Sequence, residues 1–165
     1  MKISQKILTE TIKEKRSELM KEDEDISSIQ NINNGWCHLL ADKVVYELNW
    51  EFLYQTETND FRIEGYEHEA WNKEFMKKQG IYPPEELTWE DLNFIPFDYH
   101  VWIAFEGERH GIKCSKYYDA ECPEGVDNFF NLPFFKRYIY VFKTERHLLK
   151  QKDISHEYIA NLKVE

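Results

Sequence analysis

Three residues of this chain have the types and the order needed for nucleophilic chemistry at a carbonyl carbon. The first is Cys37, which follows the polar run NINNGW at what we expect to be the first turn of a helix. Unpaired N–H groups and the positive dipole end at such a turn favour thiolate over thiol and can also bind an oxyanion. A side-chain amide would add a further donor there, and the sequence leaves three candidates open: Asn31, Asn33 and Asn34.

The second and third residues lie in a predicted β-hairpin. The segments DYHVWIAFE (98–106) and KCSKYYDAE (113–121) favour strands, and the first alternates so that His100 and Trp102 share one face. EGERHG between them has the glycines and polar residues of a hairpin loop. We therefore expect the two strands to be adjacent and antiparallel.

The register of this hairpin decides which carboxylate meets the histidine. A loop centred between Arg109 and His110 places Asp119 directly opposite His100, with Glu121 within reach on the diagonal as the alternative. An imidazole beside a carboxylate is the orienting half of a catalytic triad, because the acid fixes the tautomer and stabilises the imidazolium. A Cys37 thiolate with this pair meets the needs of acyl transfer through a thioester.

The elements that must position these residues follow from periodicity and punctuation. Apolar residues at 37, 41, 44, 48 and 52 predict a helix from Gly35 to about Tyr54, capped by Asn33 or Asn34, with Cys37 facing inward. We further expect a helix over 4–22, a polar connector SSIQNINNG, irregular chain over 55–65, a helix over 67–80 closed by Gly80, a turn capped by Thr88 and Asp91, a third strand over 136–145, and a short helix near His147 or after Asp153.

Composition limits the class of protein. The 165 residues predict a single domain, 1–165, in which 1–30 form an N-terminal helix and connector, 31–150 a catalytic-like core and 151–165 a C-terminal segment. A net charge of −10 argues against direct binding to nucleic acid or anionic lipid, although an acidic protein can also imitate DNA. The N-terminus lacks the apolar run of a signal peptide and three scattered cysteines predict reduced thiols, so we expect a cytoplasmic protein without membrane association.

Taken together, NNGWC at a helix start, H-x-W on one strand and YYDAE on the next resemble the transglutaminase-like branch of the papain-like cysteine-hydrolase superfamily. The resemblance implies an α+β fold in which a Cys-bearing helix packs on a small antiparallel sheet, with peripheral helices around this papain-like core. It assigns the catalytic roles to Cys37, His100 and Asp119, and Trp102 matches a tryptophan that often follows the histidine. It departs from papain-type enzymes in its short Cys-to-His interval and in lacking a CGSCW-like segment.

The expected function is thiol-dependent chemistry on an amide of a protein or peptide substrate: a peptidase, amidase, deamidase or transglutaminase-like acyltransferase. Neither a metal nor an organic cofactor is expected, because the cysteines and histidines lack the spacing of zinc ligands. Aromatic candidates for substrate contacts are Trp36, Trp102 and Tyr117. The alternative is a non-catalytic acidic interaction protein, an inhibitor or DNA mimic, in which Cys37 is a small core residue.

Overall fold

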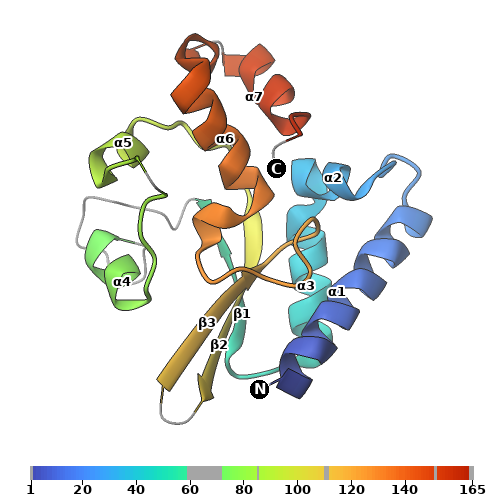
Figure 1. The fold of residues 1–165 in the computed structure, drawn as a ribbon. Coiled ribbons are helices and arrows are strands. Elements are labelled where there is room, and N and C mark those ends of the chain that lie inside the picture. The colour runs from blue at the N-terminus through green and yellow to red at the C-terminus, as the bar shows by residue number, and fades with distance from the viewer. Residues whose placement is uncertain (1, 59–71, 85, 110–111, 151, 164–165) are drawn as a thin grey trace.

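A three-stranded antiparallel sheet lies at the centre of the fold (Figure 1). The computed structural model describes residues 2–58, 72–84, 86–109, 112–150 and 152–163. The strand order is β1 (Leu53–Glu57), β2 (Val101–Arg109), β3 (Ile112–Tyr118), with β2 in the middle. Helices surround this small sheet, so the α+β class expected from the sequence is confirmed.

Alternation along β2 divides the apolar core into two clusters. Val101, Ile103 and Phe105 face a cluster that includes the buried sides of α1 (Lys2–Glu22) and α3 (Cys37–Leu48). Trp102 and Ala104 face the opposite cluster, where the aromatic residues of α6 (Pro133–Thr144) gather. Figure 1 shows α1 and α3 side by side along one side of the sheet, while α6 rises from its end. Over residues 101–105, both faces of the central strand are therefore buried.

Short elements complete the described part of the chain. They are α2 (Ile29–Asn31), a π turn (Ile32–Trp36), α4 (Lys73–Lys78), α5 (Trp89–Asn93), two 3₁₀ segments (Phe129–Asn131 and Arg146–Lys150) and α7 (Lys152–Ala160). The capping box of Thr88 and Asp91 is present as predicted, and so are a closing helix and the N-terminal helix. No described helix is long and apolar enough to cross a membrane.

The helix that carries Cys37 is shorter than its apolar pattern predicted. It ends at Leu48, because Asn49 adopts the left-handed conformation that terminates helices. Residues 53–57, expected to be helix and irregular chain, form the edge strand β1 instead. The helical spacing to Phe52 was therefore coincidental, and Phe52 is partly exposed.

The start of this helix also differs from expectation. Neither Asn33 nor Asn34 caps it: Trp36 occupies the N-cap position without a side-chain cap bond, and residues 29–36, expected to be a connector, form α2 and the π turn. Gly35, with φ of 144°, provides the break between the two helical segments, at a φ that side-chain-bearing residues rarely adopt.

The predicted third strand over 136–145 is wrong, because these residues form α6. Pro133 at its first turn and buried residues recurring at helical spacing (Phe134, Phe135, Tyr138, Ile139, Val141 and Phe142) explain the helix. The helix predicted over 67–80 is observed as Lys73–Lys78 with Asn72 as its cap. Its first part, 67–71, and the hairpin tip, 110–111, lie outside the described residues.

Candidate functional site

His100 lies between the two core clusters, directly before β2. The backbone of His100 extends the pairing of the first two strands: its carbonyl accepts from the Thr58 N–H at 3.0 Å, and its own N–H donates to Thr58 Oγ1 at 3.1 Å. The ring is fully buried, and its Nε2 lies 3.1 Å from Asp119 Oδ2. The predicted histidine–carboxylate pair is therefore present in the structure.

The register that brings this pair together differs from the predicted one. Ile103 pairs with Tyr118 and Arg109 with Ile112, so the strands are shifted by two residues relative to a loop centred between Arg109 and His110. A shift of two keeps every side chain on its predicted face, whereas a shift of one would have reversed them all. Asp119 is therefore a diagonal neighbour of His100 rather than its directly opposed residue.

Asp119 reaches the ring because the chain turns immediately after β3. Its Oδ1 accepts from the N–H groups of Glu121 and Cys122 at 3.0 and 2.9 Å, which fixes this turn. Oδ2 is thereby left for the imidazole, and the carboxylate is only 2% exposed. One carboxylate thus shapes the backbone and orients the histidine.

Cys37 is the first residue of α3 and is 4% exposed. Its sulfur accepts the N–H of Val101 at 3.4 Å. Burial alone would raise the pKa of the thiol, but interaction with His100 and the N–H groups of Val101 and His38 outweigh it, so that the pKa is lowered. The local environment therefore favours the thiolate, chiefly through His100.

The pKa of His100 is shifted in the opposite direction from that of Cys37. Burial lowers the pKa of the imidazole, but the hydrogen bond to Asp119 and the interaction with Cys37 prevail and raise its pKa to about 9. Its Nδ1 makes no hydrogen bond of standard geometry with the described residues, so the thiol and the ring interact without being aligned. Such contacts in unliganded catalytic sites commonly tighten only when substrate binds.

Aromatic rings enclose the imidazole. Phe134 of α6 stacks on it with ring centroids 4.3 Å apart and planes inclined by 17°, and Trp102 stacks at 6.2 Å. These rings exclude water and lower the local dielectric, which strengthens the attraction between the imidazolium and its anionic neighbours. Trp102, expected at a substrate site, is completely buried in this layer.

Glu121, the alternative third member of the triad, has a different partner. It forms a buried ion pair with Arg137 of α6 and accepts from Asn33 Nδ2 at 2.7 Å. Arg137 Nε also donates to the carbonyl of Leu162 at 2.8 Å. The network therefore connects the turn before Cys37, the turn after Asp119 and the C-terminal segment. Arg137 was not among the predicted site residues, because the strand predicted over 136–145 hid which residues of α6 face inward.

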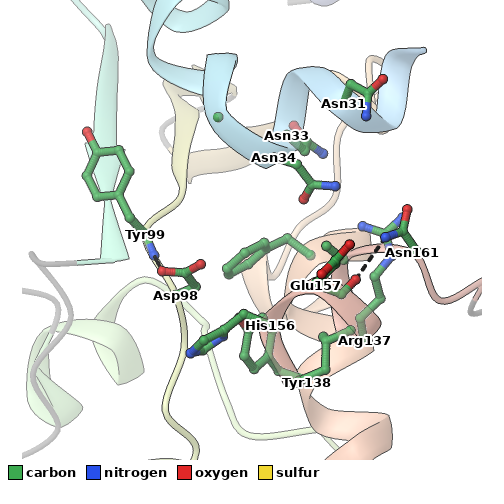
Figure 2. Close-up of a pocket in the computed structure, with 14 residues that line it drawn as sticks. Asn31, Asn33, Asn34, Asp98, Tyr99, Arg137, Tyr138, His156, Glu157 and Asn161 are labelled. Carbon is green, nitrogen blue, oxygen red and sulfur yellow. Dashed lines mark hydrogen bonds between the residues drawn. The ribbon is translucent and has the colours of Figure 1, made fainter. Parts of the chain in front are cut away.

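A cavity of about 430 Å³ opens beside this network (Figure 2). The asparagines at 31, 33 and 34 and Gly35 form one wall, residues of α6 and α7 another, and Asp98 and Tyr99 a third. Figure 2 shows Asn34 projecting from the turn toward α7, with Asp98 across the cavity. Tyr99 interacts with Cys37, and burial together with Glu57 raises the pKa of Tyr99 to about 12. Gly35, two residues before Cys37, and Phe134, which stacks on His100, line the cavity, whereas Cys37 itself does not.

The three predicted oxyanion residues line this cavity, whereas the three predicted substrate residues do not. Asn33 has committed its amide N–H to Glu121, and Asn31 Oδ1 accepts from Ser27, whereas Asn34 is exposed at the cavity wall. Trp36, Trp102 and Tyr117 do not line it: Trp36 packs against the α1–α3 cluster and the other two are buried in the core.

The remaining chemical candidates are inert in this geometry. Burial raises the pKa of the Cys122 thiol to about 11, as expected for a packed cysteine. Within the described ranges, no group of three or more His, Cys, Asp or Glu side chains is arranged to hold a metal ion.

The chain matches no protein-family model, no curated protein and no solved structure.

Proposed function

We propose that this protein performs thiol-dependent acyl chemistry on an amide, with Cys37 as nucleophile, His100 as general base and acid, and Asp119 as the residue that orients the histidine. The observation that carries the proposal is the placement of one imidazole between a carboxylate at 3.1 Å and a thiol whose pKa is lowered. This is the arrangement that activates a cysteine nucleophile. We further propose that α3 and the sheet form a divergent core of the transglutaminase-like and papain-like type.

The chemistry proceeds in two balanced steps. The sulfur of Cys37 attacks the amide carbon, the C–N bond breaks, and the amine departs with a proton from His100, leaving a thioester. A water molecule or a second amine then attacks the thioester, gives a proton to His100, and releases an acid or a new amide while Cys37 regains its thiolate. The substrate is a protein or peptide, and no cofactor takes part.

The developing negative charge on the carbonyl oxygen needs donors close to the sulfur. The start of α3 provides backbone N–H groups at this point, and Asn34 offers a side-chain amide from the adjacent cavity wall. Asn33 is a poor candidate because its amide already binds Glu121. Asn34 is therefore the one of the three asparagines that we assign to the oxyanion site.

One observation favours the second candidate, a non-catalytic interaction protein. His100 is fully buried under Phe134, so a substrate carbonyl reaches the site only if this ring or the neighbouring Tyr99 moves. A binding protein would need no such movement. The acidity of the chain suits a basic partner in either case.

The test measures the reactivity of the thiols and then their ability to form an acyl-enzyme. Near neutral pH, iodoacetamide should modify Cys37 at least about tenfold faster than Cys122, since thiolate reacts and thiol does not. His100→Ala should abolish this difference, whereas His147→Ala, at an exposed histidine, should leave it unchanged. Peptide mass spectrometry assigns the label to each cysteine.

The second readout is the transfer of an acetyl group from p-nitrophenyl acetate. The wild-type chain should gain one acetyl group on Cys37 with a burst of p-nitrophenol, and Cys37→Ser should show neither. Slow and equal alkylation of Cys37 and Cys122 would refute the proposal and leave the binding protein as the function. Fast alkylation without acetyl transfer would also count against catalysis.

A further inference from the structure

The cavity shown in Figure 2 carries negative charge that the protein does not neutralise. Asp98 and Glu157 lie on its walls, and neither forms an ion pair with a lysine or arginine of the described residues. Arg137 also lines the cavity, but it is 5% exposed and its guanidinium is paired with Glu121. The cavity therefore presents two exposed carboxylates to a ligand, and Asp98 Oδ1 also accepts the N–H of Tyr99 at 2.8 Å.

A second, independent feature points to a ligand that donates hydrogen bonds. Asn33 is 2% exposed and lines the same cavity, and its Oδ1 has no hydrogen-bond partner among the described residues. A buried amide oxygen without a donor costs about 1–3 kcal/mol. Because Asn33 Nδ2 is fixed on Glu121, the amide cannot rotate to satisfy this oxygen without losing that bond.

The size and position of the cavity suit one side chain of a substrate. A volume of about 430 Å³ is within the range of small-ligand sites. The ring of Phe134 supplies apolar surface for an aliphatic stem. The carboxylates of Asp98 and Glu157 remain available for its charged end (Figure 2). Gly35, two residues before Cys37, and Phe134, which stacks on His100, line this space and connect it to the proposed catalytic residues.

We infer that this cavity is a specificity site for a cationic side chain, an ammonium or guanidinium, of the protein substrate. The inference rests on the proposed function for its role in catalysis, but the binding of a cation by the cavity is independent of the reactivity of Cys37. Asp98 and Glu157 attract the charge, and the amide oxygen of Asn33 accepts one of its N–H groups. An anionic side chain is excluded by the same carboxylates.

The first experiment compares the charge preference of the two thiols. Aminoethyl and sulfonatoethyl methanethiosulfonate carry opposite charges and react with thiols in the same way. The ratio of their rates at Cys37, divided by the same ratio at Cys122, removes the effect of the overall acidity of the chain. We expect a cation preference of about tenfold at Cys37. The double variant Asp98→Asn/Glu157→Gln should abolish it.

A matched control removes two carboxylates elsewhere. Glu24→Gln/Glu90→Gln changes the net charge equally at exposed positions outside the cavity and should retain the preference. If Cys37 reacts rapidly but shows no preference for the cation, or if both double variants lower the preference equally, the inference is wrong while the proposed function stands.

The second experiment measures binding without reaction. In a Cys37→Ser chain, acetyl-lysine methylamide with a free side-chain ammonium should shift the NMR signals of the side-chain amides at Asn33, Asn34 and Asn161, which line the cavity. The neutral analogue with a norleucine side chain should shift them much less. Equal shifts, or shifts that Asp98→Asn/Glu157→Gln leaves unchanged, would overturn the inference whatever the reactivity of the thiol.

Discussion

The substitution Asp119→Asn tests the charge arrangement of the site with little change of shape. Asparagine retains an oxygen that accepts from the N–H groups of Glu121 and Cys122, so the turn after β3 is preserved. What is lost is the negative charge that lies 3.1 Å from His100 Nε2. The fold should therefore survive while the ionisation of the histidine changes.

The magnitude follows from the pKa of the histidine. Burial lowers this pKa and Asp119 is the foremost group that raises it, so that it lies at about 9 instead of 6.5. The difference corresponds to about 3 kcal/mol favouring the imidazolium. Without the carboxylate, burial prevails, His100 becomes neutral at pH 7, and Cys37 loses the cation that lowers its own pKa. Only about 3% of a thiol with an ordinary pKa is ionised at pH 7.

Two measurements check this result. In the NMR titration of the histidine Cε1–H signals, His100 of the wild type should titrate above 6.5 and His100 of Asp119→Asn below it. The rate of alkylation of Cys37 by iodoacetamide at pH 7 should fall by at least about tenfold in the variant. Asp25→Asn, at an exposed carboxylate, is the control that should change neither. A wild-type His100 that titrates at or below 6.5 would refute the reasoning.

Two further predictions concern the stability of the scaffold around the site. Arg137→Met leaves the largely buried Glu121 without its cationic partner, although Asn33 still donates to it. The free energy of unfolding should fall by about 3 kcal/mol in urea denaturation, and a loss below about 1 kcal/mol would show that the pair contributes little. Gly125→Ala should destabilise far more than Gly80→Ala by the same measurement. Both glycines have positive φ, but a Cβ at 125 would lie 2.5 Å from the ring of Tyr118 while one at 80 meets nothing within 4 Å.

The sequence predicted the parts of the fold that depend on local pattern. Alternation placed His100 and Trp102 on one face of β2, and the capping box of Thr88 was visible from residue types alone. The histidine–carboxylate pair was predicted from an incorrect register, and it survived because the error was an even number of residues. The sequence thus predicts more reliably which face of the sheet a side chain lies on than which residues of two strands are paired.

Properties that depend on distant segments were not predictable in this way. The edge strand β1 was predicted partly as helix and partly as irregular chain, because the apolar spacing of α3 continues to Phe52, and only the pairing of β1 with β2 decides the outcome. The strand predicted over 136–145 was wrong for the same reason. Its aromatic residues lie at mixed spacing, which fits both the helical and the strand period, and these residues form α6. The partner of Glu121 lies on α6, so the error in that helix concealed Arg137 as well.

The pH dependence of stability separates an activated thiol from a packed one. In the folded chain the pKa of His100 is raised, so its contribution is complete below pH 6.5 and is lost as the pH rises toward 9. The pKa of Cys37 is lowered, so its contribution is complete above pH 9 and is lost as the pH falls through the folded-state pKa. Between pH 6.5 and 9 the two slopes oppose each other, so the stability of the wild type should depend on pH less than either group alone would make it.

Removing the thiol leaves only the contribution of His100 to this pH dependence. In Cys37→Ala, His100 retains its carboxylate partner, so the free energy of unfolding should fall more steeply than in the wild type from pH 6.5 to 8.5, by at most about 1.4 kcal/mol per pH unit. A packed thiol predicts the opposite: burial would raise its pKa, ionisation of the unfolded chain would destabilise the wild type toward pH 9, and alanine would remove that loss. Urea denaturation of both proteins at pH 6.5, 7.5 and 8.5 measures the sign. A variant that declines less steeply than the wild type would assign Cys37 to the core and refute the thiolate–imidazolium pair on which the proposed chemistry depends.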